Sequence, residues 1–256
     1  MLQIELVEHT DIDKAFTVFN RDGFVAIKDA LTPQQLEIAQ AGAQRVIAEQ
    51  TAAVALEEAN RGFARYSFDS QTHHPEWAML IDLPTTLPII DRIWSSTDYF
   101  CTGAGGDYSL PGAKIQPLHS DLADFFNDPL GQTTFRDIPA PFIVVNFLMV
   151  DFTKENGAIR FIPATQRSHH AIPSLEDEPE WMKNSIVCAP AGTGIIRDVR
   201  CWHGGTANQS NEIRPMTSAG YFAPWFMVRP SGVLPRALHD TLSPRGQELS
   251  RMIVAD

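Results

Sequence analysis

The amino-acid sequence predicts a mainly β protein with flanking helices, built on a jelly-roll core of the double-stranded β-helix, cupin-like type. From about residue 98 the chain consists of short apolar runs separated by Gly, Pro and Asn, a spacing typical of all-β folds. Because no helix-length segment separates these runs, a doubly wound parallel sheet is not expected. The 256 residues, 44% of them hydrophobic, are enough to bury one full core. We therefore expect one domain over residues 1–256, with a helical part over about 1–97, the jelly roll over about 98–230 and a C-terminal extension over 231–256.

The first 62 residues are expected to be mostly helical. Capping residues indicate where two helices begin and where the first of them ends. A proline in the first turn of the second helix is further evidence for its N-terminus. These residues are Thr10, Asp13 and Gly23 for the first helix, and Thr32, Pro33 and Gln35 for the second. The second helix is expected to run, with an interruption, as far as Gly62.

Five later runs are predicted to be strands because they are short, apolar and bounded by turn-forming residues. They are "AKIQPLHS" (113–120), "PFIVVNFLMVDF" (141–152), "AIRFIPA" (158–164), "TGIIRDV" (193–199) and "MTSAGYFAPWFMV" (216–228). A jelly roll formed by these strands would carry the helices on its outside.

Charge and cysteine content argue against several classes of protein. With 20 basic and 31 acidic residues, the net charge of -11 would repel a phosphate backbone, so nucleic acid is not an expected partner. The chain has neither a basic N-terminal region nor an apolar run of about 18 residues, so no membrane association or export is expected. Three cysteines without a CxxC pair argue against a disulfide framework or a zinc ribbon and fit the reducing cytoplasm.

The stretch "QPLHSDLADFF" places His119 and Asp121 two residues apart. In a strand these side chains project from the same face and can bind one metal ion. An oxygen-activating Fe(II) site typically has two imidazoles and one carboxylate on one face of the metal, so it needs one imidazole in addition to this pair. The coordination positions on the other face stay open for substrates. Taken alone, the pair is better explained as a histidine hydrogen-bonded to a nearby aspartate at a strand end.

The segment "DVRCWHGGTANQSNEIRP" supplies candidates for the missing groups. His203 ends a strand run, a turn rich in Gly, Asn and Ser follows, and Arg214 opens the next run, so a hairpin would return Arg214 to His203. An inward arginine needs an anion, and its planar fork suits a carboxylate. The alternative for Arg214 is a surface salt bridge, for example to Glu212.

Together these motifs resemble the phytanoyl-CoA dioxygenase-like branch of the iron(II)/2-oxoglutarate-dependent oxygenases. The resemblance covers about residues 16–228 and rests on four motifs in order: "FNRDGFVAIKDALTP", "LHSD", "DFTKENGAIRFIPATQRSH" and "HGGTANQSNEIRP". Four ordered motifs are much more specific than any one of them. The resemblance implies an oxidoreductase that binds Fe(II) through His119, Asp121 and His203, with 2-oxoglutarate and O2 as co-substrates. It also implies that Arg214 binds the distal carboxylate of 2-oxoglutarate and that Gln116 contacts the same molecule.

The reaction that the resemblance implies is hydroxylation, desaturation or rearrangement of a small-molecule substrate. Aromatic residues in the flanking segments are candidates for the pocket wall, and each can equally belong to the core: Tyr66, Phe68, Phe125, Phe126 and Trp225. They favour a largely apolar substrate, and a secondary-metabolite intermediate is our first hypothesis. A homo- or heterodimer is compatible with the sequence, which does not determine the oligomeric state.

Two other classes of function remain open. One is a non-catalytic jelly-roll binding protein or partner subunit, and the intact set of iron ligands counts against it. The other is a cupin-type metal isomerase or hydrolase that does not use 2-oxoglutarate, and Arg214 counts against that. Cys201, two residues before His203, is a conceivable metal ligand, but a small buried Cys is the commoner state.

Overall fold

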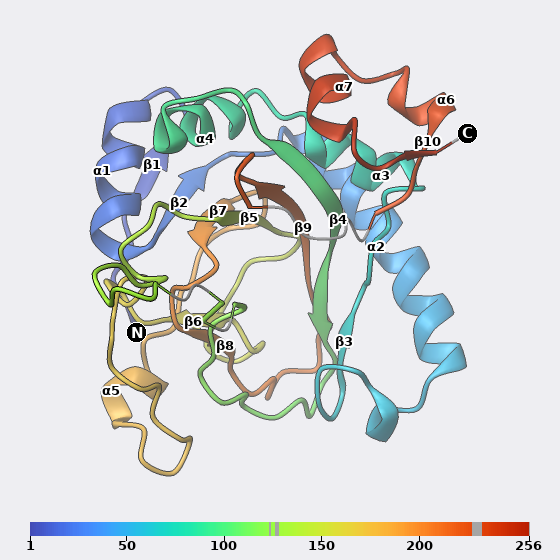
Figure 1. Ribbon diagram of the computed structural model, residues 1–256. Coiled ribbons are helices and arrows are strands. Elements are labelled where there is room, and N and C mark those ends of the chain that lie inside the picture. The colour runs from blue at the N-terminus through green and yellow to red at the C-terminus, as the bar shows by residue number, and fades with distance from the viewer. Residues whose placement is uncertain (123, 126–127, 227–231, 256) are drawn as a thin grey trace.

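The protein is built around a seven-stranded sheet, and the computed structural model describes residues 1–122, 124–125, 128–226 and 232–255 (Figure 1). The strand order is β1-β2-β7-β5-β9-β4-β3. β1 and β2 run parallel, whereas the other neighbours are antiparallel. The strands are β1 (Leu6–Glu8), β2 (Phe24–Lys28), β3 (Arg65–Ser67), β4 (Phe100–Ser109), β5 (Phe142–Leu148), β7 (Gly194–Asp198) and β9 (Arg214–Phe222). The predicted β core is therefore confirmed, and a doubly wound parallel sheet is excluded for the described residues.

A second, smaller sheet contains β6 (Ile159–Phe161) and β8 (His203–Gly205), which pair antiparallel. The segment 113–120, predicted as a strand, is not one. It lies along β8 in an extended conformation, with a bridge between His119 and His203 and a hydrogen bond of 2.9 Å from the Gln116 N–H to the Gly205 carbonyl. Pro117 lies between these contacts and has no N–H to donate, so it cannot contribute to a regular ladder.

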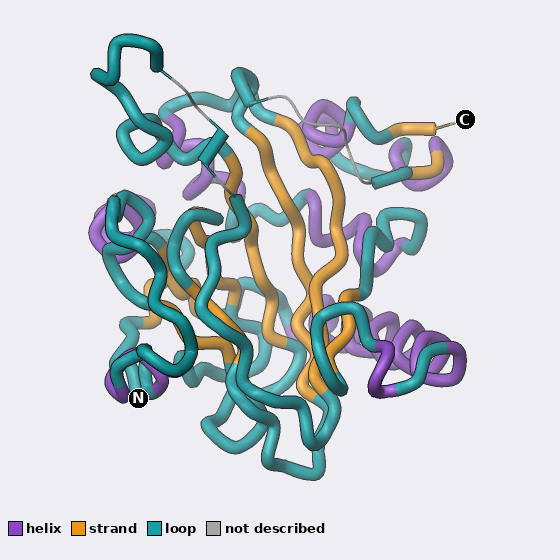
Figure 2. Tube along the Cα trace, turned by 60° about the horizontal axis from the view of Figure 1, so that its bottom comes forward, coloured by secondary structure: helices purple, strands orange, loops and turns teal. Residues whose placement is uncertain are grey.

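Helices cover the outside of the large sheet, as Figures 1 and 2 show. They are α1 (Ile12–Asp22), α2 (Pro33–Ala53), α3 (Pro75–Ala78) and α4 (Leu87–Trp94), with the short 3-10 turns η1 (Leu56–Glu58) and η2 (Met79–Ile81). Further along the chain lie α5 (Glu180–Lys183), α6 (Arg236–His239), α7 (Pro244–Ser250) and the strand pair β10 (Leu234–Pro235) and β11 (Val254–Ala255). None of the described helices has the length and apolar character needed to cross a membrane.

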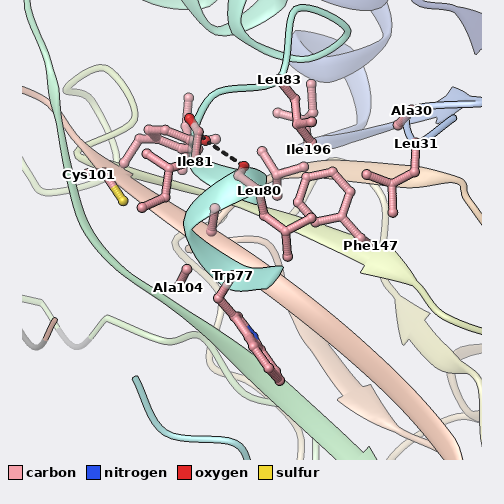
Figure 3. Close-up of a cluster of buried hydrophobic side chains, with 14 of the residues drawn as sticks. Ala30, Leu31, Trp77, Leu80, Ile81, Leu83, Cys101, Ala104, Phe147 and Ile196 are labelled. Atoms are coloured by element: carbon pink, nitrogen blue, oxygen red, sulfur yellow. Dashed lines mark hydrogen bonds between the residues drawn. The ribbon is translucent and has the colours of Figure 1, made fainter. Parts of the chain in front are cut away.

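The main hydrophobic core lies between these helices and the large sheet. Figure 3 shows part of it, with Trp77 and the η2 residues Leu80 and Ile81 packed over the strands. Burying an aliphatic or aromatic side chain of this size contributes about 1.5–3 kcal/mol. The Tyr221 hydroxyl on β9 donates to the Ile81 carbonyl at 2.9 Å, which satisfies a polar group that the core would otherwise leave without a partner.

Each strand of the large sheet presents one face to this core and the other to the interior of the jelly roll, because side chains alternate along a strand. On β3, Arg65 and Ser67 line an internal cavity, whereas Tyr66 packs in the core. On β5, Val144 and Asn146 line the cavity and Val145 packs in the core. This alternation decides which residues of the central strands can reach a ligand.

The N-terminal part differs from the sequence prediction in several details. Its first helix is capped by Asp11 and not by Thr10, although Gly23 ends it as predicted, at φ 84°. The Thr32 cap and its capping box are confirmed, but the helix ends at Ala53, well before Gly62. Three strands that were not predicted, β1, β2 and β3, lie within residues 1–97, because pairing with the large sheet outweighs weak local signals.

β4 was also missed, because its sequence "FCTGAGGDYS" contains three glycines, which are disfavoured in strands. Two of them are needed where the backbone of another segment comes close. A Cβ on Gly105 would meet the Asp69 carbonyl oxygen, and a Cβ on Gly106 would meet that of Met216. Glycine in a strand interior often marks such a close approach.

Candidate metal centre

Three potential metal ligands meet at one place inside the jelly roll. The donor atoms of His119, Asp121 and His203 lie within 4.8 Å of one another. Oδ1 of Asp121 is 3.5 Å from Nε2 of His203 and 3.9 Å from Nε2 of His119. The three side chains that the sequence singled out as iron ligands are therefore brought together by the fold.

The backbone explains this convergence. His119 and His203 exchange both backbone hydrogen bonds, at 2.9 and 3.0 Å, and their imidazole rings lie side by side with centroids 4.3 Å apart. The Asp121 N–H donates to the Val199 carbonyl at 3.0 Å, which holds the aspartate beside the loop that leads into β8. The pairing of residues 119 and 203 thus replaces the regular strand that the sequence predicted.

Both imidazoles are oriented by backbone carbonyls. Nδ1 of His119 lies 3.1 Å from the Pro117 carbonyl, and Nδ1 of His203 lies 2.9 Å from the Cys201 carbonyl. Because a carbonyl only accepts, Nδ1 carries the proton in the neutral ring and Nε2 keeps its lone pair for a metal. Burial and the neighbouring His203 lower the pKa of His119, which favours the neutral form that binds metals.

The two oxygens of Asp121 have different partners. Oδ1 faces the imidazoles, whereas Oδ2 accepts a hydrogen bond of 2.6 Å from Nη1 of Arg197. Burial alone would raise the pKa of this carboxyl group, but Arg197 and His203 hold it well below its ordinary value. The Asp121 carboxylate is therefore ionised across the physiological pH range, as a metal ligand would have to be.

These ligands line a cavity of about 390 Å³ between the large and the small sheet. Its volume is in the range of small-molecule sites. The polar residues of its wall, apart from the three candidate ligands, are Arg61, Arg65, Ser67, Asp107, Gln116, Asn146, Arg197, Arg214 and Ser218. Apolar walls come from Phe142, Val144, Ile159 and Met216. The cavity is thus markedly cationic in a chain whose net charge is -11.

Two buried arginines lie at one end of the cavity. Arg214, 1% exposed, donates to Oδ1 of Asp107 at 3.2 Å and stacks over Phe152, while its Nε has no partner among the described residues. Arg65 donates to the Thr206 carbonyl at 2.8 Å, while its Nη1 lacks a partner among the same residues. Burial and the nearby Arg214 lower the pKa of Arg65 to about 10. Two guanidinium groups with one carboxylate between them suit a further anion.

Arg214 points inward, as predicted, but the predicted hairpin is wrong. β8 belongs to the small sheet and β9 to the large one, so the turn after His203 crosses from one sheet to the other. Arg214 therefore stands on the large sheet and pairs with Asp107 of β4, not with Glu212. The segment between the strands is held by Asn208, whose Nδ2 donates to the Glu212 carbonyl at 2.8 Å.

Gln116 lies on the cavity wall, where the resemblance places a co-substrate contact. Its Oε1 accepts from the Gly205 N–H at 3.0 Å, and its Nε2 donates to the Arg61 carbonyl at 3.1 Å. Both ends of the side chain therefore have backbone partners. A contact between Gln116 and 2-oxoglutarate stays a prediction.

Four of the aromatic residues expected to form the pocket wall are described, and none of these four lines the cavity. Tyr66 and Phe68 are buried in the main core, because they alternate with the β3 residues that face the cavity. Phe125 and Trp225 are each 49% exposed and lie outside the cavity. Phe126 lies outside the described residues. For Tyr66 and Phe68, the structure agrees with the alternative that they belong to the core.

Cys201 is not part of the centre either. Its side chain is fully buried and approaches the Ile162 carbonyl and the Thr165 hydroxyl, and burial raises the pKa of its thiol to about 12. The group of donor atoms that could hold a metal ion contains His119, Asp121 and His203 and does not include the sulfur of Cys201.

Sequence reasoning missed two buried arginines of the cavity, Arg65 and Arg197. Both stand inside short strand runs, "ARYSFDS" and "TGIIRDV", where a buried charge is unusual. That signal was present in the sequence, but it did not show which face each arginine occupies.

A metal site of two imidazoles and one carboxylate inside a jelly roll defines a class, the facial-triad non-haem metal proteins. Comparison with known families agrees with this class. The sequence model described as phytanoyl-CoA dioxygenase (PhyH) matches residues 19–216. The chain belongs to the phytanoyl-CoA dioxygenase family, which confirms the resemblance seen in its motifs.

Individual relatives are distant. The chain is 29% identical to Dioxygenase af480 of Aspergillus fumigatus over 68% of its own length, and this match spans only 54% of that relative. It is 25% identical to the Fe(II)/2-oxoglutarate-dependent dioxygenase nvfF of Aspergillus novofumigatus, over 93% of this chain and 81% of that one. The fold resembles the epimerase SnoN in complex with Fe3+, alpha ketoglutarate and nogalamycin RO, with a TM-score of 0.66, 18% identity, and coverage of 92% and 91%.

Proposed function

We propose that the chain is a non-haem Fe(II)- and 2-oxoglutarate-dependent dioxygenase. The proposal rests on one observation, a His-Asp-His donor set and two buried arginines on the walls of the same cavity. Two imidazoles and a carboxylate suit oxygen-activating Fe(II), and the arginines suit a dicarboxylate. The name of the relative nvfF supports the same reaction class. The arginine pair counts against a metal isomerase or hydrolase, because such an enzyme does not need to bind a dicarboxylate co-substrate. The metal-binding donor set counts against a non-catalytic subunit.

In this proposal His119, Asp121 and His203 hold the iron, and Arg214 with Arg65 holds the distal carboxylate of 2-oxoglutarate. The bound iron, with 2-oxoglutarate and O2, supplies an oxidant able to attack an unactivated C–H bond while 2-oxoglutarate is converted to succinate and CO2. The chain contributes the rest. Its carbonyls orient the imidazoles, its arginines position the co-substrate, and the apolar part of the wall limits water near the reacting groups.

For the substrate, we propose a small molecule that combines an apolar surface with hydrogen-bond acceptors. The expectation of a largely apolar substrate relied on aromatic residues, and the four of them that the structure describes lie away from the cavity. Apolar Phe142 and Val144 share the wall with Asn146, Arg197 and Ser218, which offer polar contacts. A secondary-metabolite intermediate fits this mixture. A solved structure similar to this chain, an alpha-ketoglutarate-dependent epimerase, is described as coming from nogalamycin biosynthesis.

The test of this function is anaerobic addition of Fe(II) and then 2-oxoglutarate to the purified protein. A visible charge-transfer band that needs both components is expected, followed by succinate formation when O2 is admitted. Neither a metal isomerase or hydrolase nor a non-catalytic subunit would give this band. A protein that binds Fe(II) but gives neither the band nor succinate would contradict the proposal.

Arg214 should determine the affinity for 2-oxoglutarate. Truncating one partner of a buried charge pair costs about 2–5 kcal/mol, so the apparent Kd should rise roughly thirty-fold or more in Arg214→Ala. Arg214→Lys keeps the charge but loses the fork, so its Kd should be intermediate. Titration of the charge-transfer band measures both values.

Arg92→Ala provides the control, because Arg92 is an exposed arginine paired with Asp13 on the surface. Its affinity for 2-oxoglutarate should equal that of the wild type, and iron content should be unchanged in all three variants. If Arg214→Ala bound 2-oxoglutarate as tightly as the wild type, the assignment of Arg214 would be wrong.

We further propose that residues 1–256 act as one domain. The main core joins residues of β2, α2, β5 and the C-terminal Leu249 in a single cluster, which supports this proposal. The cytoplasmic location and a possible homo- or heterodimer stay predictions.

A further inference from the structure

Arg197 is a buried arginine of the cavity for which neither the motifs nor the proposed binding of 2-oxoglutarate provides a role. It lies on β7, where its backbone pairs with Val144 of β5, and its side chain enters the cavity. The residue is 7% exposed. A buried guanidinium of this kind needs partners that match its fork.

Its partners are specific. Nη1 donates to Oδ2 of Asp121 at 2.6 Å, and Nε donates to Oδ1 of Asn146 at 2.9 Å. Asn146 is itself 3% exposed and is fixed in the middle of β5, between β7 and β9. Arg197 is therefore anchored on two central strands and reaches from them to a carboxylate that lies on an irregular segment.

The geometry separates the two carboxylate oxygens of Asp121. With Oδ2 engaged by Arg197, Oδ1 is the oxygen that faces Nε2 of both histidines. Outer hydrogen bonds of this kind commonly orient metal ligands and tune the metal. A positive charge next to a ligand also disfavours each additional positive charge on the metal.

We propose that Arg197 is a positioning residue that presents one oxygen of Asp121 to the metal and whose charge favours the divalent over the trivalent ion. This inference rests on the proposed iron site. Arg197 acts through Asp121 and Asn146 and makes no contact with the metal. Its effect is to keep the resting iron ferrous, the state that the proposed reaction requires.

Three variants separate charge from orientation. Arg197→Lys keeps the charge but has a single donor group, Arg197→Gln keeps an N–H donor without charge, and Arg197→Leu keeps neither. Arg61→Ala is the matched control, because Arg61 is an exposed arginine of the same cavity and solvent screens its charge. Unchanged thermal unfolding would show that each variant is folded.

The first measurement is the midpoint potential of the iron-loaded protein without 2-oxoglutarate. In Arg197→Gln the ratio of Fe(III) to Fe(II) affinity should rise at least about tenfold, which lowers the potential by about 59 mV. Arg197→Lys and Arg61→Ala should stay close to the wild type. An unchanged potential in Arg197→Gln, or an equal fall in Arg197→Lys, would refute the role of the charge.

The second measurement is the affinity for Co(II), a divalent probe that needs no turnover. Gln and Leu both remove the charge, but only Leu removes the hydrogen bond to Asp121. Arg197→Leu should therefore bind Co(II) about 10–100-fold more weakly than Arg197→Gln. Equal affinities would show that Arg197 does not position Asp121. A wild-type protein that binds no Fe(II) or Co(II) would contradict the metal site itself and is distinguishable from both results.

Discussion

A His203→Ala variant should lose tight Fe(II) binding and 2-oxoglutarate turnover together. Removing one of three protein ligands leaves too few donors to hold the ion. Changes to residues that only hydrogen-bond to a ligand weaken metal binding by up to about 100-fold, so losing a ligand should raise the Kd for Fe(II) by more than that. His119→Ala and Asp121→Ala should behave in the same way, because each supplies one donor atom to the same cluster. Anaerobic Fe(II) titration and succinate formation measure the two effects.

His170→Ala is the control, since His170 is an exposed histidine outside the cluster. It should bind Fe(II) with the wild-type affinity. Stoichiometric iron with undiminished succinate in His203→Ala would mean that the three residues are not the ligands. Loss of both in His170→Ala would show that the assay reports damage to the fold.

A Glu178→Ala variant should unfold with a free energy about 3–5 kcal/mol lower than that of the wild type. Glu178 forms a fully buried ion pair with Arg160 of β6, and neither side chain is exposed. Arg160 in turn donates to the Gln116 carbonyl at 2.6 Å, next to the segment that carries His119. Removing the carboxylate leaves the buried Arg160 cation without its charge partner. This destabilises the folded state much more than removing both charges would.

Urea unfolding tests this prediction through a lower midpoint at an unchanged slope. The matched control is the double variant Arg160→Met with Glu178→Leu, which removes both charges. Replacing a buried pair by apolar residues of similar size is often neutral or stabilising, so this variant should be much closer to the wild type. A Glu178→Ala protein as stable as the wild type would show that water or another group compensates Arg160.

Local sequence motifs were sufficient to predict the residues of the candidate metal centre. The candidate ligands, their order and the arginine proposed for 2-oxoglutarate were found through the resemblance carried by "LHSD" and "HGGTANQSNEIRP", because a metal site restricts the residue types at these positions. The short apolar runs were sufficient for the β core. The same patterns failed where the long-range pairing of a segment differs from its local propensity, as in the glycine-rich β4 and the irregular segment before His119.

The faces of the strands could not be derived from local patterns. In "ARYSFDS" the sequence left open whether the aromatic residues belong to the cavity wall or to the core; in the structure Arg65 faces the cavity and Tyr66 packs in the core. A shift of one residue exchanges the two faces, because the period of side chains along a strand is two. The register of a strand within the whole sheet, and not its own composition, decides between these alternatives.

The sequence by itself determined the class of fold, the family and the three candidate metal ligands, because these depend on residue types and spacings along the chain. Only the tertiary structure decided which cations surround the centre. Arg214 meets Asp107, 107 residues away, and Arg197 meets Asp121, 76 residues away. Such contacts are set by the order of strands in the sheet and by the crossing from the small sheet to the large one. Electrostatic interactions depend on distance in space, and that distance exists only after the chain has folded.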